Sequence, residues 1–252
     1  MELRRKRMHM KSIDAKYLEI LKKVDTPTVC NVIELFKIRS NTDGFMDRRI
    51  KAMFPEFPPM VGYAVTLKFQ SKIEKKKTGY DDLGTHVEAL LKVPAPRVIC
   101  IEDIHEGDFG ANCGEMMAAM YKAFGGVGLI TSGMVRDTTA IRKRKFQLFA
   151  RGTVASHGYA AFDALMEPVV IGGVLINPGD LIHGDGDGVT IIPGDIAENV
   201  AVLCEKFIAQ EKKWLKYVDS GKATVDGTRA EIKKYGEYQK RETEKIFGKR
   251  NK

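Results

Sequence analysis

Two acidic residues and one arginine stand out because of their spacing. Glu115 follows Gly114, and twenty residues later Arg136 is directly followed by Asp137. We expect Glu115 in the first turn of a helix. The chain between Glu115 and Arg136 is expected to form that helix and a returning strand, which would bring the three side chains together. Carboxylates of this kind bind Mg²⁺ directly or through water, and a planar guanidinium suits an oxyanion.

A purely structural role, an arginine–carboxylate bridge between a loop and a helix, also fits these residues. The backbone N–H groups of Met116 and Met117 favour a binding site instead. They lie in the first turn of the predicted helix, where they have no partner within the helix. They could therefore bind a carboxylate of a substrate. The side chains of Met116, Met117 and Met120 are expected to be core residues.

Several other residues could carry chemistry, but a structural role explains each of them better. His157 could reach the pocket as an acid or base, yet a single histidine is more often hydrogen-bonded for structural reasons. His183 is expected to be structural within a strand. Asp185 and Asp187 resemble part of a calcium loop, but its other acidic ligands are missing, so we expect a turn between strands. Cys113 is expected to be small and buried rather than a reactive thiol.

The elements that would position these residues follow from hydrophobic periodicity and turn signals. Helices are predicted at 13–24, 27–36, 82–93, 114–125, 137–145 and 228–247, together with a long helix capped by Asp195. Strands are predicted at 62–69, 97–102, 127–131 and 147–150, and the segment 168–193 is rich in β signals. Strands cluster late in the chain, so an α/β fold with a mixed sheet is expected rather than a regular βαβ series.

The composition fits one folded domain. The 252 residues are 44% hydrophobic and 29% charged, which excludes a wholly disordered chain. The net charge of +8 is concentrated at the ends, because residues 1–12 carry +4, residues 205–252 carry +6 and the body carries −2. Solvated termini explain this pattern best, and contact of the basic ends with an acidic partner such as RNA is the alternative. Nucleic acid is not expected as a partner, because the sequence has no aromatic and basic strand of the kind that stacks bases.

The cysteine positions and the apolar runs indicate the cellular compartment that we expect for the protein. The four cysteines at positions 30, 100, 113 and 204 are far apart and form no C-x-x-C pair. This spacing gives little support to a disulfide framework or a zinc knuckle, and a reducing cytoplasm fits best. No apolar run reaches the roughly 18 residues of a membrane span, and no apolar stretch follows the basic residues 4–7. We therefore expect neither a membrane span nor a secretory signal.

The pattern Gly114-Glu115, twenty residues, Arg136-Asp137 resembles the signature of the RraA-like family, which includes the class II 4-hydroxy-4-methyl-2-oxoglutarate aldolases. In that signature a glycine and an aspartate precede twenty residues and an Arg-Asp pair. Further matching segments are DTPTVCNVI (25–33), GYAVT (62–66), FARG (149–152) and GGVLINPGDLIHGDGDGVTIIP (172–193). Together they span about residues 25–194, roughly two thirds of the chain.

The resemblance implies a fold and an assembly. Residues 1–194 would form an RraA-like swivelling α/β/β domain of the phosphohistidine-like kind, including N-terminal helices. Residues 195–252 would form a C-terminal helical extension. The chain would assemble as a trimer or a dimer of trimers, with active sites at the subunit interfaces.

The resemblance also implies a site for Mg²⁺ or Mn²⁺. Asp137 would hold the metal, and Glu115 would act through a metal-bound water. Arg136 would bind the keto oxygen of a 2-oxo acid and stabilise the enolate. Gly114 and the backbone amides that follow Glu115, those of Met116 and Met117, would receive the pyruvyl carboxylate.

These implied roles amount to a metal-dependent lyase of the cytoplasm. It would carry out aldol cleavage or decarboxylation of a small pyruvyl-containing 2-oxo acid, of the 4-hydroxy-4-methyl-2-oxoglutarate or oxaloacetate type. The chemistry is coherent, because a metal and an arginine neutralise the charge of a pyruvate enolate. The alternative is a non-catalytic binding protein that regulates a ribonuclease, since such regulators share the fold.

The sequence departs from the family pattern in three places. Glu115 replaces an aspartate and adds a methylene group. The aldolase signature continues with an acid three residues after Arg-Asp, where this chain has Ala140. The aldolases also take an acid from a neighbouring subunit near their C-terminus, and residues 195–252 offer no clear match for it.

Overall fold

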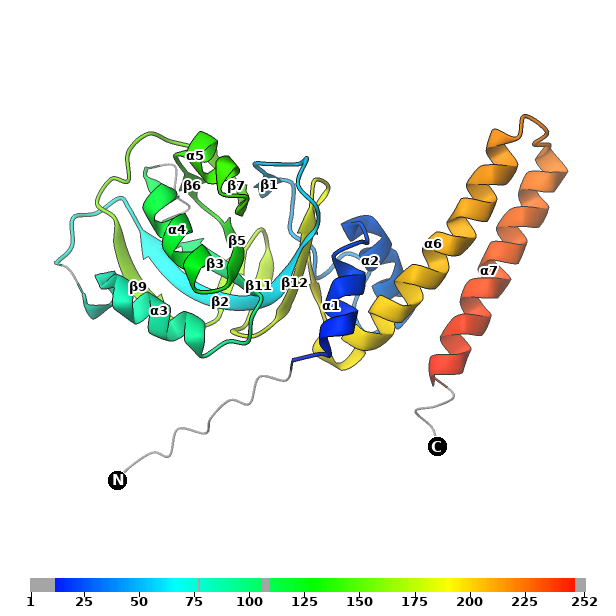
Figure 1. The fold of residues 1–252 in the computed structure, drawn as a ribbon, viewed down its shortest axis with the longest axis horizontal. Coiled ribbons are helices and arrows are strands. Elements are labelled where there is room, and N and C mark those ends of the chain that lie inside the picture. Colours follow the sequence, from blue (N-terminus) through cyan, green and yellow to red (C-terminus); the bar gives the residue numbers. More distant parts are fainter. Residues whose placement is uncertain (1–11, 77, 106–108, 248–252) are drawn as a thin grey trace, which may run out of the picture.

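An eight-stranded mixed sheet forms the centre of the structure (Figure 1). The computed structural model describes residues 12–76, 78–105 and 109–247. Along the sheet the strands are β1 (Lys51–Ala52), β7 (Gln147–Ala150), β5 (Gly126–Thr131), β3 (Arg97–Asp103), β2 (Met60–Gln70), β12 (Leu181–Asp185) and β13 (Gly188–Ile192), and β9 (Ala161–Leu165) also pairs with β2. The four strands from β7 to β2 are parallel, and the others pair antiparallel. The predicted α/β fold with a mixed sheet is confirmed.

Strand β2 is long enough to serve three partners. One of its edges pairs in parallel with β3 from Tyr63 to Phe69. The opposite edge pairs with β12 near Met60 and with β9 near Gln70. A single 11-residue strand therefore joins the parallel part of the sheet to the antiparallel part.

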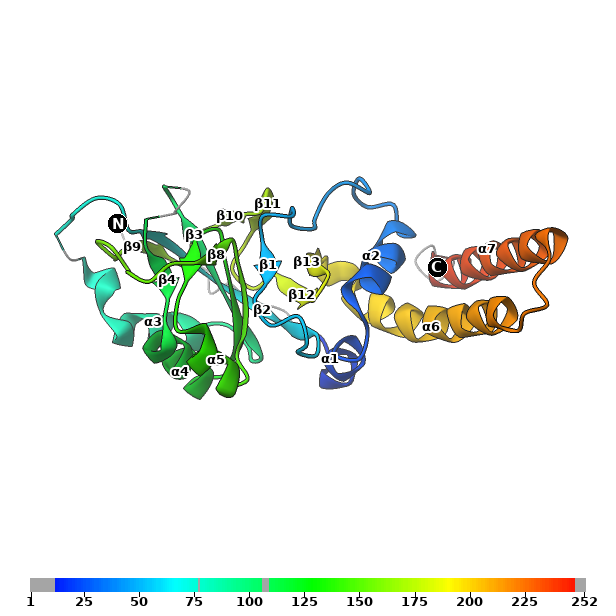
Figure 2. The ribbon, with the colours of Figure 1, turned by 90° about the horizontal axis from the view of Figure 1, so that it is seen from above.

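Both faces of the sheet are covered, which explains why its inner strands read as continuous apolar runs. In β3, Ile99 and Ile101 belong to the larger core, whereas Val98 and Cys100 belong to the smaller one. Figure 2 shows α3 (Leu83–Leu91), α4 (Glu115–Ala123) and α5 (Thr138–Lys143) on one side of the sheet, and the hairpin of β10 (Val169–Ile171) and β11 (Val174–Ile176) on the other.

A second, small parallel sheet lies beside the carboxyl ends of the main strands. It consists of β4 (Ala111–Cys113), β6 (Met134–Val135) and β8 (Gly152–Thr153), with β6 in the middle. Strand β6 follows β5 after a short bend, and β8 follows β7 in the same way. The small sheet therefore extends the main sheet and carries the candidate site.

Helices α1 (Ala15–Leu21) and α2 (Thr26–Glu34) pack at the β12–β13 end of the sheet. Asp25 is the N-cap residue of α2, and its carboxylate accepts a 2.7 Å hydrogen bond from the N–H of Thr28. Pro27 lies in the first turn, where a missing N–H costs nothing. Helix α2 thus begins one residue before the predicted range 27–36, with Asp25 as its cap.

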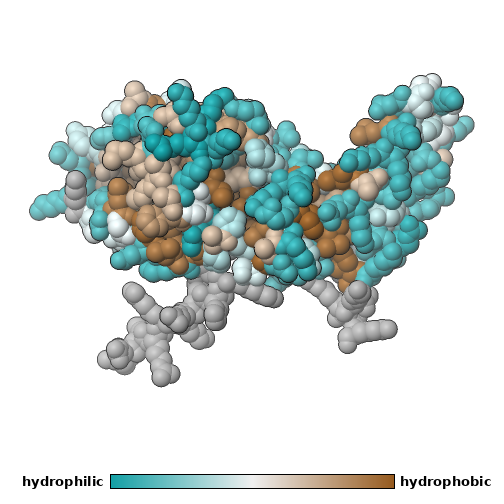
Figure 3. Space-filling model, in the orientation of Figure 1, coloured by the Kyte–Doolittle hydropathy of each residue, from teal (hydrophilic) through white to brown (hydrophobic). Residues whose placement is uncertain are grey.

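The C-terminal part forms an antiparallel helical hairpin of α6 (Ala197–Asp219) and α7 (Val225–Phe247). The first half of α6 packs on α1 and α2, and the rest of the hairpin projects away from the body (Figure 1). In the space-filling view, hydrophobic side chains fill the recess between body and hairpin and reappear over the upper part of α6 (Figure 3).

Three predictions about the elements are wrong. A regular βαβ series was not expected, but β2, β3, β5 and β7 are consecutive parallel neighbours with α3, α4 and α5 between them in the chain. Asp195 does not cap the long helix, because it lies inside the 3₁₀ turn Gly194–Ile196; the residue at the N-cap position of α6 is Ile196. The chain between Glu115 and Arg136 contains two strands, β5 and β6, rather than one. Within the described residues, no helix is long and apolar enough to cross a membrane.

Candidate active site

The carboxyl ends of three parallel strands meet at the candidate site. In the small sheet, Cys113 of β4 lies beside Val135 of β6, which lies beside Thr153 of β8. The N–H of Arg136 donates to the carbonyl of Cys113 at 3.0 Å, and the N–H of Val154, directly after β8, donates to the carbonyl of Val135 at 3.1 Å. The residues that directly follow β4, β6 and β8 therefore lie close together.

Asp137 lies among these residues and links the start of α5 to the start of α4. It is the N-cap residue of α5 and adopts a left-handed backbone conformation, with φ of +56°. Its Oδ2 accepts a 3.0 Å hydrogen bond from the N–H of Glu115, and Nε of Arg136 lies 3.7 Å from the same oxygen. The predicted approach of Arg136–Asp137 to the start of α4 is thus present in the structure.

Gly114 is the residue that allows this approach. A Cβ atom at Gly114 would lie 2.7 Å from Oδ2 of Asp137 and 3.0 Å from Nε of Arg136. Contacts under 3 Å force a neighbour to move, so any side chain at position 114 would displace the carboxylate. The glycine before the first acid is therefore required by the geometry of the site.

The carboxylate of Glu115 does not face Asp137. Its Oε1 accepts hydrogen bonds from Nε and Nη2 of Arg144, at 2.9 and 2.7 Å. Arg144 lies at the C-terminal end of α5 and was not among the residues that the sequence singled out. The structure therefore joins the backbone of Glu115 to Asp137, but its side chain to a second arginine.

The amino end of α4 offers free backbone donors. The first N–H bonded within this helix is that of Ala118, which donates to Gly114. The N–H groups of Met116 and Met117 precede it and lie in the first turn, where a helix has no internal acceptor for them. The side chain of Met116 is 82% exposed, so its prediction as a core residue is wrong, whereas Met117 and Met120 pack against the core.

The site is an open surface rather than a closed pocket. The side chains of Arg136, Asp137, Glu115 and Arg144 are 36–44% exposed. Arg136 also reaches the loop after β8, where Nη1 lies 3.5 Å from the carbonyl of Ala155. A small substrate bound here would be covered by the described chain on one side only.

The donor chemistry at Asp137 fits a largely hydrated Mg²⁺ or Mn²⁺. Mg²⁺ is usually bound through one or two carboxylates and keeps several waters. The half-exposed carboxylate of Asp137 supplies one such ligand. Among the residues that the structure describes, no three His, Cys, Asp or Glu side chains are grouped to hold a metal ion. Other ligands would be water, substrate or a second chain.

The remaining candidates lie elsewhere. His157 is exposed and its backbone lies against Gly110, at the amino end of β4, so it does not join the site. Asp185 and Asp187 form the turn between β12 and β13, as predicted, and Asp185 also accepts from the N–H at the start of α2. Burial raises the pKa of the Cys113 thiol to about 12, which makes it a poor nucleophile.

His183 is a structural residue, as predicted. It is fully buried, and its ring nitrogens contact the Thr26 hydroxyl at 2.9 Å and the Leu21 carbonyl at 3.0 Å. All four cysteines lie unpaired in the structure.

A buried polar cluster supports the small sheet and was missed by the sequence analysis. Asp103, at the end of β3, accepts a 2.9 Å hydrogen bond from Asn112 of β4, and Asn112 in turn accepts from Thr131 of β5 at 2.6 Å. Gly133 packs against this cluster where the chain bends into β6. The available signal was a run of polar residues at the carboxyl ends of two apolar strands.

Comparison with known proteins identifies the family. The model of the RraA-like family (Aldolase/RraA) matches residues 26–191, and the chain belongs to this family. A Halalkalibacterium halodurans protein, provisionally named 4-hydroxy-4-methyl-2-oxoglutarate aldolase, is 38% identical over 103 residues. That match covers 40% of this chain and 49% of the relative, so it spans about half the length of the relative.

Solved structures agree on the fold. An uncharacterized protein from Pseudomonas syringae superposes with a TM-score of 0.70 at 23% identity, covering 88% of this chain and 96% of that one. Streptomyces coelicolor RraAS2, described as an unusual member of the RNase ES inhibitor RraA protein family, gives 0.64 at 22% identity, covering 83% and 98%. The shared structure therefore includes most of this chain.

Proposed function

We propose that this protein is a divalent-metal-dependent lyase that forms a pyruvate enolate from a 2-oxo acid. The substrate class is a small pyruvyl-containing acid of the oxaloacetate or 4-hydroxy-4-methyl-2-oxoglutarate type. The observation that carries the proposal is the junction of Arg136–Asp137 with the free amino end of α4, which brings a cation, a carboxylate and backbone donors together. The relative provisionally named as an aldolase supports the same class.

Different residues of the site bind the carboxylate and the keto oxygen of the substrate. The N–H groups of Met116 and Met117 bind the carboxylate next to the keto group, because a helix amino end favours anions. Arg136 donates to the keto oxygen and stabilises the negative charge that develops there. Asp137 and water would hold Mg²⁺ or Mn²⁺, which when bound supplies further positive charge to that oxygen.

The reaction then breaks one carbon–carbon bond. In a decarboxylation, the bond to the distal carboxylate breaks, CO₂ leaves and its electron pair forms the enolate. In an aldol cleavage, a base removes the hydroxyl proton, a carbonyl product leaves and the same enolate remains. Arg136 stabilises this shared enolate until a proton from solvent converts it to pyruvate. No lysine is required, because no Schiff base forms.

We also propose that a second copy of the chain completes the site. The open geometry around Arg136 and Asp137 leaves one side of a bound substrate uncovered. Neighbouring copies in a trimer or dimer of trimers would cover it and exclude water. Unpaired cysteines fit a reducing compartment such as the cytoplasm.

The test is release of pyruvate, coupled to lactate dehydrogenase. Oxaloacetate and 4-hydroxy-4-methyl-2-oxoglutarate are offered separately, with Mn²⁺ or Mg²⁺ and then with excess EDTA. Spontaneous decarboxylation of oxaloacetate is subtracted with Asp137→Asn protein at the same metal concentration. Metal-dependent pyruvate from either substrate above this control supports the proposal, and the ratio of the two rates separates decarboxylase from aldolase. The absence of both turnover and Mn²⁺ binding would refute the proposal and would favour a non-catalytic binding protein.

A further inference from the structure

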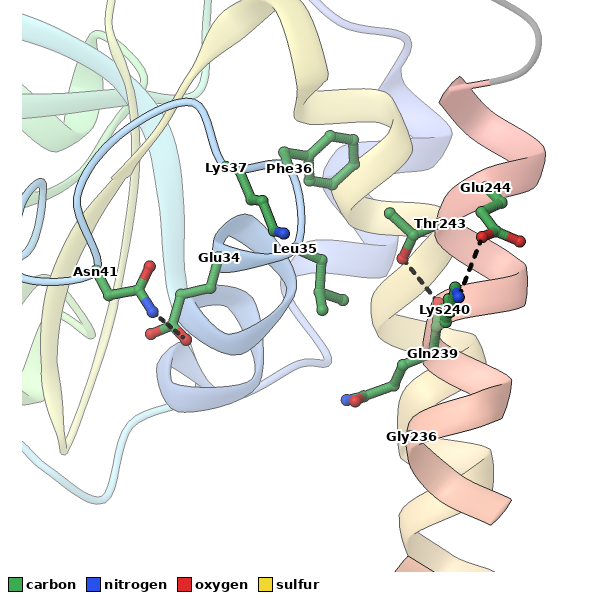
Figure 4. Close-up of a pocket in the computed structure, with 10 residues that line it drawn as sticks. All are labelled: Glu34, Leu35, Phe36, Lys37, Asn41, Gly236, Gln239, Lys240, Thr243 and Glu244. Carbon is green, nitrogen blue, oxygen red and sulfur yellow. Dashed lines mark hydrogen bonds and ion pairs between the residues drawn. The ribbon is translucent and has the colours of Figure 1, made fainter. Parts of the chain in front are cut away.

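Near the body, basic residues of the hairpin are paired with carboxylates. Glu242 binds Lys206 at 2.6 Å and also binds Lys245. Lys240 pairs with Glu244 at 4.0 Å, beside the cavity between α7 and the end of α2 (Figure 4). These three cations are therefore neutralised within the chain.

Four lysines at the far end of the hairpin have no such partners. They are Lys212, Lys213, Lys216 and Lys222. All four are exposed, and within the described part of the chain none of them pairs with a carboxylate. We call residues 212–225 the hairpin tip. It contains these four lysines and a single acid, Asp219, so its net charge is +3.

The two acidic residues nearest to the hairpin tip contact other side chains of the hairpin. Glu211 accepts a 3.2 Å hydrogen bond from Oη of Tyr235, which holds its carboxylate against α7. Asp226 pairs with Arg229 at 3.1 Å. The positive charge of the hairpin tip is therefore not cancelled by its neighbours.

Apolar and aromatic side chains occupy the same segment. Leu215, Val218 and Val225 are 53%, 41% and 68% exposed. Trp214, the only tryptophan of the chain, is partly exposed beside Tyr217, with ring centroids 6.1 Å apart. Lysine, tryptophan and exposed aliphatic residues on one amphipathic helix are typical of segments that lie in the interface of a membrane.

The position of the hairpin tip allows contact with a flat surface. The loop between α6 and α7 lies at one end of the longest axis of the molecule, and no other described element extends as far in that direction (Figure 2). A planar bilayer can therefore reach this loop without touching the body. We propose that the hairpin tip binds the surface of an anionic lipid bilayer.

The order of the residues along α6 fits the depth of such a contact. Val218 lies next to the end of the helix at Asp219, and Leu215 is one turn, about 6 Å, further back. Lys212 and Lys213 are about 10 Å from the end, which matches the depth of the headgroup layer that such helices enter. The aliphatic stems of these lysines can lie along the apolar side chains while the ammonium groups meet lipid phosphates.

The aliphatic residues favour a lipid surface over a nucleic acid. Both ligands carry phosphates, so the lysines alone do not distinguish them. Single-stranded RNA is bound by cations and by aromatic rings that stack on bases, which leaves Leu215, Val218 and Val225 without a role. A lipid interface buries such side chains. A second copy of the hairpin tip would instead bring a charge of the same sign, +3, to this segment.

The fluorescence of Trp214 tests the contact directly, because it is the only tryptophan of the chain. Full-length protein is mixed with vesicles of phosphatidylcholine, or of phosphatidylcholine and phosphatidylglycerol in equal parts. Emission should shift to shorter wavelength with the anionic vesicles alone, as the indole leaves water. Sedimentation with these vesicles without a shift in emission would place the contact elsewhere, for example at the basic residues 4–7, and would overturn the proposal.

Paired substitutions test the charge. Lys213→Gln with Lys216→Gln should lower the partition coefficient for anionic vesicles about 30-fold, because each lysine near an anionic surface adds to the attraction. Lys51→Gln with Lys92→Gln is the matched control, since both lysines are exposed on the body, and it should bind as the wild type does. Equal binding by the two double variants would contradict the proposal.

A second pair of variants tests the apolar contact. Leu215→Gln with Val225→Gln should lower the same coefficient by about 10-fold, because two side chains no longer leave water. Leu91→Gln with Leu175→Gln is the control, because these leucines are 60% and 58% exposed but lie on α3 and β11. Circular dichroism checks that each variant keeps its helices. Unchanged binding by the first double variant would leave only a charge contact and would overturn the proposal.

The same measurements distinguish the other occupants. If single-stranded RNA shifts the emission of Trp214 and anionic vesicles do not, the hairpin tip is a nucleic-acid site and the proposal is wrong. If Leu215→Gln with Val225→Gln lowers the mass of the assembly without vesicles, a second copy covers the hairpin tip and the proposal is also wrong. Membrane binding is independent of the proposed lyase activity, because none of the substituted residues belongs to the candidate active site.

Discussion

Two nitrogens of Arg144 bind the same oxygen of Glu115, with Nε at 2.9 Å and Nη2 at 2.7 Å. The contact joins the C-terminal end of α5 to the first turn of α4, while Asp137 joins the other end of α5 to the same turn. Helix α5 is thus tied to α4 at both ends. Glu115 participates in both ties, once through its backbone and once through its side chain.

This arrangement predicts the effect of Arg144→Gln. The ion pair is about 40% exposed on each side, so its loss should lower the free energy of unfolding by less than about 1 kcal/mol. Residues that orient a ligand of a metal-bound water typically change metal affinity by about 10- to 100-fold when removed. We therefore expect the Mn²⁺ concentration for half-maximal activity to rise about 10-fold. Urea unfolding and Mn²⁺ titration of activity measure the two effects, and an unchanged Mn²⁺ requirement would contradict the role assigned to Glu115.

Gly114→Ala should damage the site without unfolding the protein. The new methyl group would lie 2.7 Å from Oδ2 of Asp137, so the carboxylate must move away from the N–H of Glu115. The backbone itself can accept alanine, because φ of Gly114 is −127°. We expect a loss of about 10²-fold in kcat/KM, comparable to a misplacement of about 1 Å in other active sites. Gly152→Ala serves as the control, since its Cβ would meet only the flexible side chain of Met134 at 3.4 Å or more.

Asp137→Asn should abolish metal-dependent turnover and preserve the fold. Asparagine tolerates the left-handed conformation found at this position, and its amide oxygen can still accept from Glu115. The substitution therefore removes the charge with little change in shape. Mn²⁺ binding by electron paramagnetic resonance should be lost, whereas the thermal melting temperature should stay within about 2 °C. Retained Mn²⁺ binding would place the metal elsewhere.

Arg136→Ala should lower kcat by about 10²- to 10³-fold, the loss typical of removing a donor to a developing oxyanion. Arg136→Lys should recover only part of this activity, because an ammonium group cannot reproduce the planar donor pair. KM should rise less than kcat falls, since the contact strengthens as the enolate forms. Steady-state kinetics with oxaloacetate and Mn²⁺ would separate these effects. A raised KM with an unchanged kcat would indicate a role in binding alone.

The sequence predicts the main sheet well because both of its faces are covered. Apolar runs such as 97–102 and 127–131 are long enough to be recognised as buried strands, and they occur as β3 and β5. The strands of the small sheet have only two or three residues, which is too short to show any periodicity. The sheet that holds the candidate site could therefore not be predicted, although the residues that it brings together could.

Side-chain partners were harder to predict than backbone positions. The spacing places Glu115 and Asp137 near each other, but it does not reveal that Arg144 binds the carboxylate of Glu115. Arg144 belongs to the basic run 142–145, in which nothing distinguishes one cation from the next. Met116 illustrates the same limit, because an apolar residue in the first turn of a helix can face solvent when that turn forms a site.

Two buried histidines connect stability to pH. His86 is fully buried, and its ring nitrogens contact the carbonyl of Tyr80 at 2.7 Å and the hydroxyl of Tyr121 at 3.0 Å. His183 is buried in the same manner, between a carbonyl and a hydroxyl. Burial lowers the pKa of both side chains, because a charged imidazole would lose its hydration.

The free energy of unfolding should consequently fall as the pH drops below about 6.5, the pKa of an unfolded histidine. Below that pH these histidines are protonated in the unfolded chain but stay neutral in the native state. Each of them therefore lowers the free energy of unfolding by up to about 1.4 kcal/mol per pH unit. Above that pH the two histidines are neutral in both states, so their full contribution to the free energy of unfolding is present. Urea unfolding at pH 7.5 and 5.5 should show this fall in the free energy of unfolding. In His183→Asn the difference between the two pH values should be smaller by about 1 kcal/mol. His157→Asn, at an exposed position, should leave the loss unchanged. An equal loss in the wild type and in His183→Asn would show that carboxylates elsewhere, rather than the buried imidazole of His183, set the acid limit of the fold.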